Sequence, residues 1–363
     1  MKTLKIVFLS NWRDNPYKTL LMNHLTHFEV EIEEYFWNHF FLPIFLPLVL
    51  QKGKFDILHL HFSLQTFIAG KTLASQFIKF ILLLTQIFIL KLIGIKLVLT
   101  VHEWHNKFQN KAIDSSYIQI ALLHKLLHAI ITHCETTKNE IIAELKIKNK
   151  HKVFVVPHGN YIGTYNNKIG RLEARAILGI PPKNLVFLIF GGIYRYKGVV
   201  EAIDAFKKLQ QQKINLLIAG NIHEAKLEGI ILKKIKGYEN ILFYPKLIPN
   251  DEIQIYLNAC DCLVVPYKVF TTSGVAILGM SYGRACIAPN TGFFKDILDE
   301  SGSFLYDSDN PYGLLQAMKI AVEKKDMLAE MGKYNFKVVE KWNWNYVSEQ
   351  TLNIYQWCLG MNL

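Results

Sequence analysis

The stretch LIFGGIYRYKGVVEAIDAF, residues 188–206, carries the clearest structural signal in the chain. An apolar run typical of a buried β-strand leads into paired glycines, Gly191 and Gly192, and an amphipathic helix follows. Glycines let a ligand approach the backbone, and the turn brings Arg195 and Lys197 to a helix start whose free N–H groups attract anions. The pattern predicts a strand–turn–helix unit with a diphosphate site, or else an ordinary turn with incidental surface cations.

A second loop of this kind lies within DCLVVPYKVFTTSGVAILGMSYGRACIAPNTG, residues 261–292. After an apolar run, Thr271, Thr272 and Ser273 precede Gly274, where a helix of small and apolar residues begins. Hydroxyl groups and free backbone N–H groups at a helix start form a cradle for an anion. The alternative is a plain N-cap, in which one hydroxyl only satisfies the first turn of the helix.

Outward from these loops, short apolar runs alternate with longer amphipathic ones. This alternation predicts repeated βαβ units with parallel sheets, and a polar segment interrupts it near residue 165. Because 363 residues exceed the usual length of one domain, we expect two α/β domains. The predicted strands are 4–9, 57–60, 96–101, 129–132, 185–190, 215–219, 241–244, 262–265 and 285–288.

The composition indicates which classes of binding partner and which cellular compartment to expect. Lys and Arg number 41 against 30 Asp and Glu, and this charge of +11 predicts an anionic partner: nucleic acid, an acidic membrane or a phosphorylated substrate. The five cysteines are odd in number and form no CxxC pair, which favours a reducing compartment. The apolar run at the start is too short for a signal peptide, so we expect a cytoplasmic protein.

One segment, FIKFILLLTQIFILKLIGIKLVLT at residues 77–100, departs from the usual pattern of a surface helix. Between Lys79 and Lys91 the apolar run covers about 16 Å of helix, too short for a hydrocarbon core of about 30 Å. A wide apolar face flanked by lysines is typical of a helix lying in a membrane surface, predicted over 75–95. The run FFLPIFLPLVL at 40–50 would add a second apolar surface. The alternative is a helix buried between the sheet and its neighbours.

Polar side chains follow the predicted strands of the first half. His102 and Glu103 end KLVLTVHEWH, His61 ends ILHLHF, and an early loop places Asn15 and Tyr17 after the first strand. Ligands of open α/β sheets bind at this edge, where a histidine can hydrogen-bond a hydroxyl or act as a base. The alternatives are packed histidines and ordinary turn residues. HEWHN differs from the zinc helix HExxH, so we expect no metal site.

Taken in order, these segments resemble the two-domain glycosyltransferases of the family 4 type, which use the GT-B fold. The likeness covers nearly the whole chain and rests on KIVFLSNWRDNPY, LKLIGIKLVLTVHEWH, VFVVPHGNY, FGGIYRYKG, LLIAGN, NACDCLVVPY and TTSGVAILGMSYGRACIAPNTG. The resemblance implies two facing Rossmann-like domains with parallel sheets, an acceptor-binding one over 1–165 and a nucleotide-sugar-binding one over 166–340. It also implies a C-terminal helix within 341–363 that crosses back to the first domain.

The resemblance also assigns residues of the second domain to the donor. Lys197 matches the family's diphosphate lysine, and Gly192 lies in the same loop. Arg195 joins them as a diphosphate ligand, although it is displaced by one position from the family arginine. A variant TSG loop stands where many members have two glutamates eight residues apart, and this chain has neither glutamate. Its diphosphate-binding residues are Thr272, Ser273 and Gly274, and Asn221 is the nucleoside-binding residue.

In the first domain the resemblance points to the reacting centre. His102 matches the family's cleft histidine, and Glu103 stands where an acidic or amide residue is common, so these two are the expected catalytic residues. Asn15, Tyr17 and His61 are the expected acceptor-binding residues.

The activity that the resemblance implies is a metal-independent, hexosyl-type glycosyltransferase that uses a nucleotide-sugar as co-substrate and no cofactor. The expected acceptor is a glycan or a lipid-linked sugar in exopolysaccharide or surface-glycan biosynthesis. An anionic membrane surface, on the inner face of the cell membrane, is a further expected partner, and nucleic acid is not. The alternatives are a catalytically inactive GT-B binding protein, a nucleotide-sugar epimerase or phosphorylase, and an RNA-binding protein.

Overall fold

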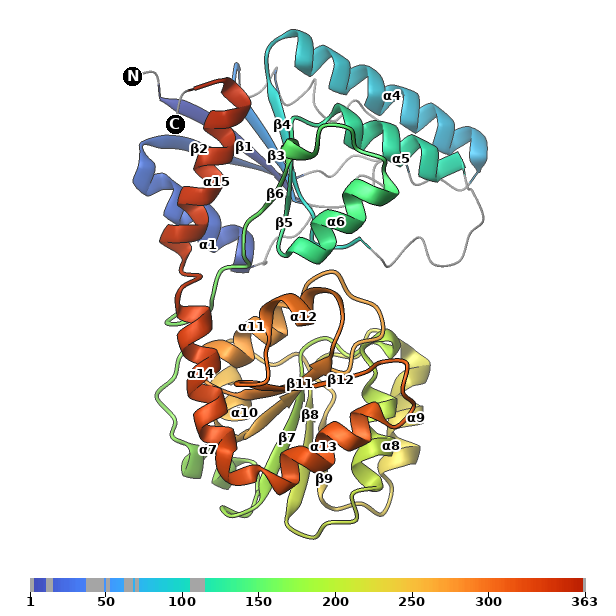
Figure 1. The fold of residues 1–363 in the computed structure, drawn as a ribbon, viewed down its shortest axis with the longest axis vertical. Helices are drawn as coiled ribbons and strands as arrows, with labels where there is room; N and C mark the ends of the chain where they lie inside the picture. The colour runs from blue at the N-terminus through green and yellow to red at the C-terminus, as the bar shows by residue number, and fades with distance from the viewer. Residues whose placement is uncertain are drawn as a thin grey trace. The chain divides into compact units, whose positions relative to one another are not determined.

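The chain forms two compact units, each with its own sheet and core (Figure 1). The structure is a computed structural model that describes residues 3–10, 16–36, 49, 53–61, 68, 72–104 and 115–361. The N-terminal unit comprises residues 1–159 and 343–363, and the C-terminal unit comprises residues 160–342. The N-terminal unit is therefore built from both ends of the sequence.

A six-stranded parallel sheet forms the centre of the N-terminal unit, in the order β2-β1-β3-β4-β5-β6. Apolar residues meet in register across it, since Ile6 lies between Ile32 and Ile57. The strands are β1 (Leu4–Ser10), β2 (Val30–Phe36), β3 (Ile57–Leu60), β4 (Lys96–Thr100), β5 (Ala129–Thr132) and β6 (Val153–Val155).

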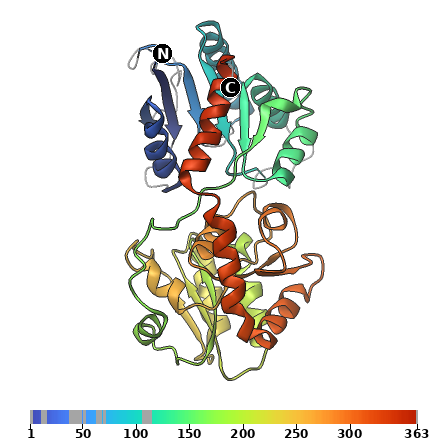
Figure 2. The same ribbon diagram turned by 60° about the vertical axis from the view of Figure 1, so that its left-hand side comes forward.

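Alternate residues of β1 face two different layers of helices, because successive side chains of a strand point to opposite faces. Val7 and Leu9 pack with α4, α5 and α6, whereas Ile6 and Phe8 pack with α1 and α15. Figures 1 and 2 show α1 and α15 side by side on their face of the sheet. The helices are α1 (Pro16–Leu25), α4 (Leu73–Leu92), α5 (Ser115–Leu126), α6 (Glu135–Glu144) and α15 (Trp344–Leu359).

The C-terminal unit has a second parallel sheet, in the order β9-β8-β7-β10-β11-β12. Its central strands are buried along their whole length, as expected when helices cover both faces. The strands are β7 (Leu185–Phe190), β8 (Ile214–Ala219), β9 (Ile241–Tyr244), β10 (Cys262–Val264), β11 (Ala285–Pro289) and β12 (Ser303–Tyr306). The helices are α7 (Arg171–Ile177), α8 (Val199–Lys207), α9 (Ala225–Ile235), α10 (Ile253–Ala259), α11 (Gly274–Ser281), α12 (Gly292–Ile297), α13 (Gly313–Glu323) and α14 (Leu328–Glu340).

The prediction of an α/β fold with parallel sheets is confirmed, and α15 packs in the N-terminal unit as the predicted crossing helix does. Helix α4 begins at Leu73, where the Thr72 side chain caps it, and runs for 20 residues. It is longer than the apolar run between its lysines, and by length and composition alone it is long and apolar enough to cross a membrane. Of the second apolar run, 40–50, only Val49 lies within the described residues.

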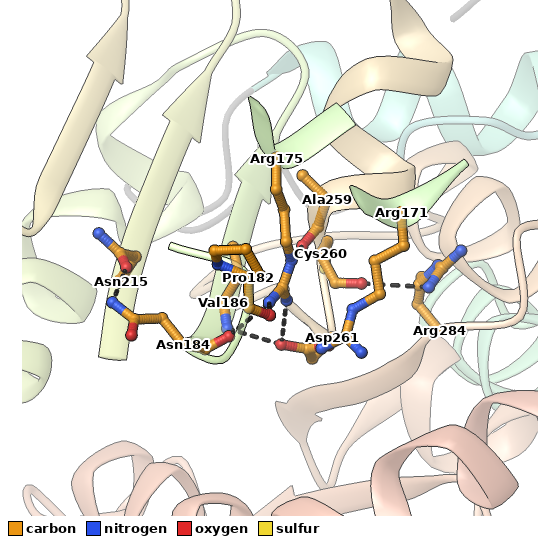
Figure 3. Close-up of polar contacts among 10 residues, drawn as sticks. All are labelled: Arg171, Arg175, Pro182, Asn184, Val186, Asn215, Ala259, Cys260, Asp261 and Arg284. Atoms are coloured by element: carbon orange, nitrogen blue, oxygen red, sulfur yellow. Dashed lines mark hydrogen bonds and ion pairs between the residues drawn. The ribbon is translucent and has the colours of Figure 1, made fainter. Parts of the chain in front are cut away.

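A fully buried arginine joins α7 to the start of β10 in the C-terminal unit (Figure 3). The Arg175 guanidinium donates to Asp261 Oδ2 at 2.7 Å, and the same oxygen accepts the Val186 N–H at 2.8 Å. Its other N–H groups donate to the carbonyl oxygens of Pro182, Asn184 and Ala259. Burial lowers the pKa of Arg175, and the neighbouring Asp261 opposes that shift. The buried charge of Arg175 thus depends on Asp261.

Replacing Arg175 tests this dependence. Arg175→Met leaves Asp261 without its buried partner, and we expect the free energy of unfolding of the C-terminal unit to fall by about 3–5 kcal/mol. Arg171 pairs with the other oxygen of Asp261 at 2.5 Å, but its side chain is half exposed, so Arg171→Met should cost less than about 1 kcal/mol. Urea denaturation of both variants measures the difference, and equal losses would contradict it.

Candidate functional site

The C-terminal unit reverses its strand order between β7 and β10. From β7 the chain continues outward through β8 and β9, whereas β10, β11 and β12 extend in the other direction. The loops that leave β7 and β10 therefore lie where the strand order reverses, at the carboxyl edge of the sheet, which is the usual place for ligands in such folds. Both loops selected from the sequence, at 191–198 and 265–274, leave from these two strands.

Close approaches between these loops require glycine. Gly198 has φ +71°, and a Cβ there would lie 2.0 Å from the Pro266 carbonyl oxygen of the other loop. Gly191 has φ +87°, and its added Cβ would meet the Val275 side chain in the first turn of α11 at 3.0 Å. The loop after β7 therefore lies directly against the start of α11, and the two candidate anion sites form one surface.

Lys197 lies at the centre of this surface. Its ammonium Nζ is 5.5 Å from the centroid of the Tyr194 ring and 5.3 Å from that of Tyr267, both within cation–π range. Burial lowers its pKa to about 8. No carboxylate pairs with it in the described part of the chain. The site thus holds a half-buried cation whose charge is compensated only by aromatic rings.

The hydroxyl groups before α11 have two different roles. Ser273 Oγ accepts the N–H of Ala276 at 3.2 Å, so Ser273 is the N-cap of the helix. The Thr272 Oγ1 atom is buried and has no hydrogen-bond partner among the described residues. A buried hydroxyl without a partner costs free energy, so Thr272 is available to donate to a ligand.

The remaining predicted donor residues lie around the same edge. The Gly192 backbone faces the stacked rings of Tyr194 and His223, whose centroids are 4.4 Å apart. Arg195 is exposed, and its backbone N–H donates to Glu224 at 2.7 Å. Asn221 follows β8 with its side chain exposed, and its carbonyl accepts the Ile193 N–H at 2.7 Å.

Histidines from three neighbouring strands meet in the N-terminal unit. His61, His102 and His133 follow β3, β4 and β5, which are adjacent in the sheet. His61 Nδ1 lies 3.2 Å from His102 Nε2, and His102 Nδ1 lies 3.4 Å from His133 Nε2. His133 Nδ1 lies 3.0 Å from the Val156 carbonyl oxygen. These contacts form a histidine chain of three rings, anchored on the backbone.

The anchor determines the tautomer of every ring in the histidine chain. A carbonyl oxygen only accepts, so His133 must carry its proton on Nδ1 and accept at Nε2. His102 must then donate from Nδ1 and accept at Nε2, and His61 must donate from Nδ1. The Nε2 lone pair of His61 is left at the free end, and this atom is buried without a hydrogen-bond partner among the described residues.

Further aromatic groups enclose the histidine chain. Tyr17 is buried, with its ring centroid 4.9 Å from that of His102 and 5.2 Å from those of His133 and Trp344. His59 lies behind His61, with Nδ1 2.5 Å from the Tyr355 hydroxyl and Nε2 2.8 Å from Thr100 Oγ1. Tyr17 therefore supports the rings from within the unit.

Burial keeps these histidines neutral. It lowers the pKa of His133 to about 4 and those of His59 and His158 to about 3, with neighbouring histidines adding to the shift in the latter two. The pKa values of His61 and His102 are also well below the ordinary value, chiefly through burial. Neutral rings are required for the N–H to N hydrogen bonds of the histidine chain.

Three of these histidines, His59, His133 and His158, were not among the predicted site residues. His133 and His158 stand just after β5 and β6, so the rule that selected His61 and His102 would also have found them. Glu103 is exposed beside His102, and Asn15 lies outside the described residues. Within the described ranges no group of three His, Cys, Asp or Glu side chains could hold a metal ion.

Comparison with known proteins assigns both units to glycosyltransferase families. Residues 6–160 match Glycosyltransferase Family 4, and residues 170–338 match Glycosyl transferases group 1. The chain belongs to the glycosyltransferases. One match covers most of the N-terminal unit and the other covers most of the C-terminal unit, so each unit of this glycosyltransferase matches a glycosyltransferase family.

Solved structures show that this glycosyltransferase has the GT-B fold. Sucrose-phosphate synthase from Thermosynechococcus elongatus aligns with TM-score 0.78 and 15% identity, covering 99% of this chain and 100% of that one. Anabaena HepE in complex with UDP and glucose aligns with TM-score 0.72 and 14% identity, covering 96% and 98%. At these identities the likeness establishes the fold, and the GT-B prediction is confirmed.

Curated relatives match this glycosyltransferase over part of their length. GDP-mannose:glycolipid 4-beta-D-mannosyltransferase of Xanthomonas campestris pv. campestris is 28% identical over 134 residues, which are 36% of this chain and 38% of the relative. D-inositol 3-phosphate glycosyltransferase of Streptomyces avermitilis is 22% identical over 239 residues, 62% of this chain and 51% of the relative. The chain thus spans about two fifths to one half of these relatives.

Gly198 offers a test of the loop geometry. In Gly198→Ala the alanine must adopt a left-handed conformation, which costs about 1–2 kcal/mol, and its Cβ clashes with Pro266. The free energy of unfolding of the C-terminal unit should therefore fall by more than about 3 kcal/mol, or the loop should rearrange. Gly237 also has positive φ, at +81°, but an added Cβ has nothing within 4 Å. Gly237→Ala should therefore show the conformational cost alone, and a cost equal to that of Gly198→Ala in urea denaturation would refute the close approach.

The neutral histidines predict a pH dependence of stability. Because His133 has a lower pKa when folded than when unfolded, its contribution is present above about pH 6.5 and is lost as pH falls toward 4. His133→Asn keeps a donor near Val156 but cannot titrate. It should reduce the slope of unfolding free energy against pH, between pH 4.5 and 6, by about 1 kcal/mol per pH unit. The matched control is His151→Asn, at an exposed histidine outside the histidine chain, and a change of slope as large as that of His133→Asn would contradict the prediction.

Proposed function

We propose that this glycosyltransferase moves a sugar from a nucleoside-diphosphate donor bound by the C-terminal unit to an acceptor bound by the N-terminal unit. The observation that carries the proposal is the Lys197 ammonium, which lies between two tyrosine rings without a carboxylate partner among the described residues. A diphosphate would supply the missing counter-charge. Two structural neighbours are described with nucleotides, HepE with UDP-glucose and an Arabidopsis starch synthase with ADP.

The proposed chemistry depends mainly on charge. As the sugar leaves, negative charge grows on the nucleoside diphosphate, and donors fixed in advance near that charge lower the barrier. Lys197 supplies a cation, Thr272 Oγ1 an uncommitted hydroxyl, and the first turn of α11 free N–H groups. Arg195 is an exposed second cation of the same loop. With these groups the transfer needs no metal and no cofactor.

In the N-terminal unit, we assign the acceptor hydroxyl to the free end of the histidine chain. His61 Nε2 has a lone pair and no partner among the described residues, so it can accept a hydroxyl proton in a hydrogen bond. Both ring nitrogens of His102 are already engaged, which makes this residue a positioning residue. Glu103, exposed beside it, remains the candidate for direct contact with the sugars.

The acceptor we favour is a lipid-linked sugar used in surface-glycan assembly. Helix α4 of the acceptor unit exposes an apolar face, which suits a substrate held at the inner surface of the cell membrane. The Xanthomonas relative is named for transfer to a glycolipid, which supports the same class of acceptor.

A nucleotide panel with Lys197→Ala tests the donor site. A ligand at a hundred times its Kd stabilises a protein by about 2.7 kcal/mol, so one of UDP, GDP or ADP should raise the melting temperature by roughly 5 °C or more. Lys197→Ala should lose at least half of that rise, whereas Lys183→Ala, an exposed lysine of the same unit, should keep it. If no nucleotide stabilises the protein while a short RNA does, the proposed donor site is wrong.

Turnover separates the transferase from its alternatives. Release of the nucleoside diphosphate should require an acceptor, and mass spectrometry should find the acceptor heavier by one sugar. A protein that binds nucleotide but shows no turnover with any acceptor would be an inactive binding protein. Conversion of the nucleotide-sugar without an acceptor would identify an epimerase.

A further inference from the structure

Helix α4 presents an apolar face on the outside of the N-terminal unit (Figure 1). Four large side chains are 69%, 56%, 60% and 71% exposed, namely Leu73, Phe77, Phe88 and Leu92. Among the exposed residues of this helix, all of which are described, only Thr85 and Lys91 are polar. A helix bordering water normally carries polar residues on that side. This face therefore requires an apolar partner.

One polar residue of α4 lies toward the unit instead. Gln86 is buried, and its amide donates to the Leu82 carbonyl of its own helix at 3.0 Å. Phe80, Leu83 and Ile87 fill the core on the same side. Because this packing fixes the helix along the unit, its outer face offers an apolar strip about 30 Å long that lies along a surface and does not cross it.

A basic pocket of about 560 Å³ lies at the amino edge of the sheet in the same unit. It is lined by Lys125, Lys146, Lys148, Lys152 and His128, among others, and no carboxylate is among its lining residues. Lys125, Lys146 and Lys148 are exposed and make no ion pair with any described residue. The pocket therefore offers three uncompensated cations to one ligand.

The basic pocket begins where α4 ends. Lys91, in the last turn of α4, donates to the Leu126 carbonyl at 3.1 Å. Lys152 donates to three carbonyls in the adjoining turn, those of His124, Lys125 and Leu127. Both ammonium groups cap the carboxyl end of α5. Burial, and after it the charges of Lys91, Lys96 and Lys152, lower the pKa of His128 to about 4.

We propose that α4 lies in the surface of an anionic bilayer and that the basic pocket binds the phosphate of a lipid headgroup. The apolar face enters the acyl boundary, and the pocket beside it meets the layer of phosphates. A second copy of this chain fits less well, since a two-fold interface through α4 would leave both lysine clusters without a counter-charge, whereas an anionic bilayer supplies one. This inference deepens the membrane association that accompanies the proposed acceptor, and it does not depend on the donor site.

Vesicle flotation of the full chain, without nucleotide or acceptor, tests the proposal. Wild-type protein should float with vesicles of phosphatidylcholine and phosphatidylglycerol at 3:1. Phe77→Asp/Phe88→Asp should lower partitioning at least tenfold on any vesicle. Lys146→Ala/Lys148→Ala should lower it about 25-fold on anionic vesicles only, at about fivefold for each lysine. Neither double variant removes a buried side chain, and circular dichroism confirms that each is folded.

Matched controls lie in the C-terminal unit. Leu247→Asp changes an apolar residue that is as exposed as those on α4, and Lys324→Ala/Lys325→Ala removes two exposed lysines. Both controls should float like wild type.

The proposal is overturned if the wild-type protein binds neither anionic nor neutral vesicles, or if the α4 variant floats like wild type. It is also overturned if α4 instead mediates dimers in solution. Equal binding to neutral vesicles, or binding of free glycerol phosphate with no flotation, would overturn the headgroup site. Flotation measures no turnover, so these outcomes can be interpreted even if the proposed transferase activity is not found.

Discussion

All described strands of both sheets run parallel, and this constraint determines where the candidate site residues lie. Parallel strands direct every strand-to-helix loop to one edge, so residues far apart in sequence become neighbours there. His61, His102 and His133 form a chain because β3, β4 and β5 are adjacent and end at the same level. In the other unit, the same rule places Lys197 and Thr272 on one surface.

The sequence was sufficient to predict the central strands and the loops that follow β7 and β10, because buried parallel strands are continuous apolar runs. It missed β2, β6 and β12, which all lie at the edges of their sheets. Edge strands are half exposed and tolerate polar residues, as the glutamates of VEIEEYF in β2 illustrate. Their periodicity therefore resembles that of a loop or surface helix.

The contacts of individual side chains were the other feature that could not be predicted from the sequence. The position of His102 at a strand end indicates that it faces the carboxyl edge, but not that His61 and His133 occupy both of its ring nitrogens. Likewise, the apolar character of 77–100 does not tell which face of α4 the sheet covers. In the folded unit the polar Gln86 is buried and the apolar Phe88 is exposed. Only the arrangement in space reveals this reversal of the usual polarity.

The return of α15 to the N-terminal unit has a consequence for folding during synthesis. Tyr355 and Trp344 belong to the core that also contains Phe8 and Tyr17, so the first unit to be translated is completed by the last helix. Until residues 344–359 have left the ribosome, the face of the first sheet that α1 and α15 cover together has only α1, while the whole of the C-terminal unit is already available to fold. The nascent chain therefore carries an unfinished apolar surface for most of its translation, which is the kind of surface that chaperones bind.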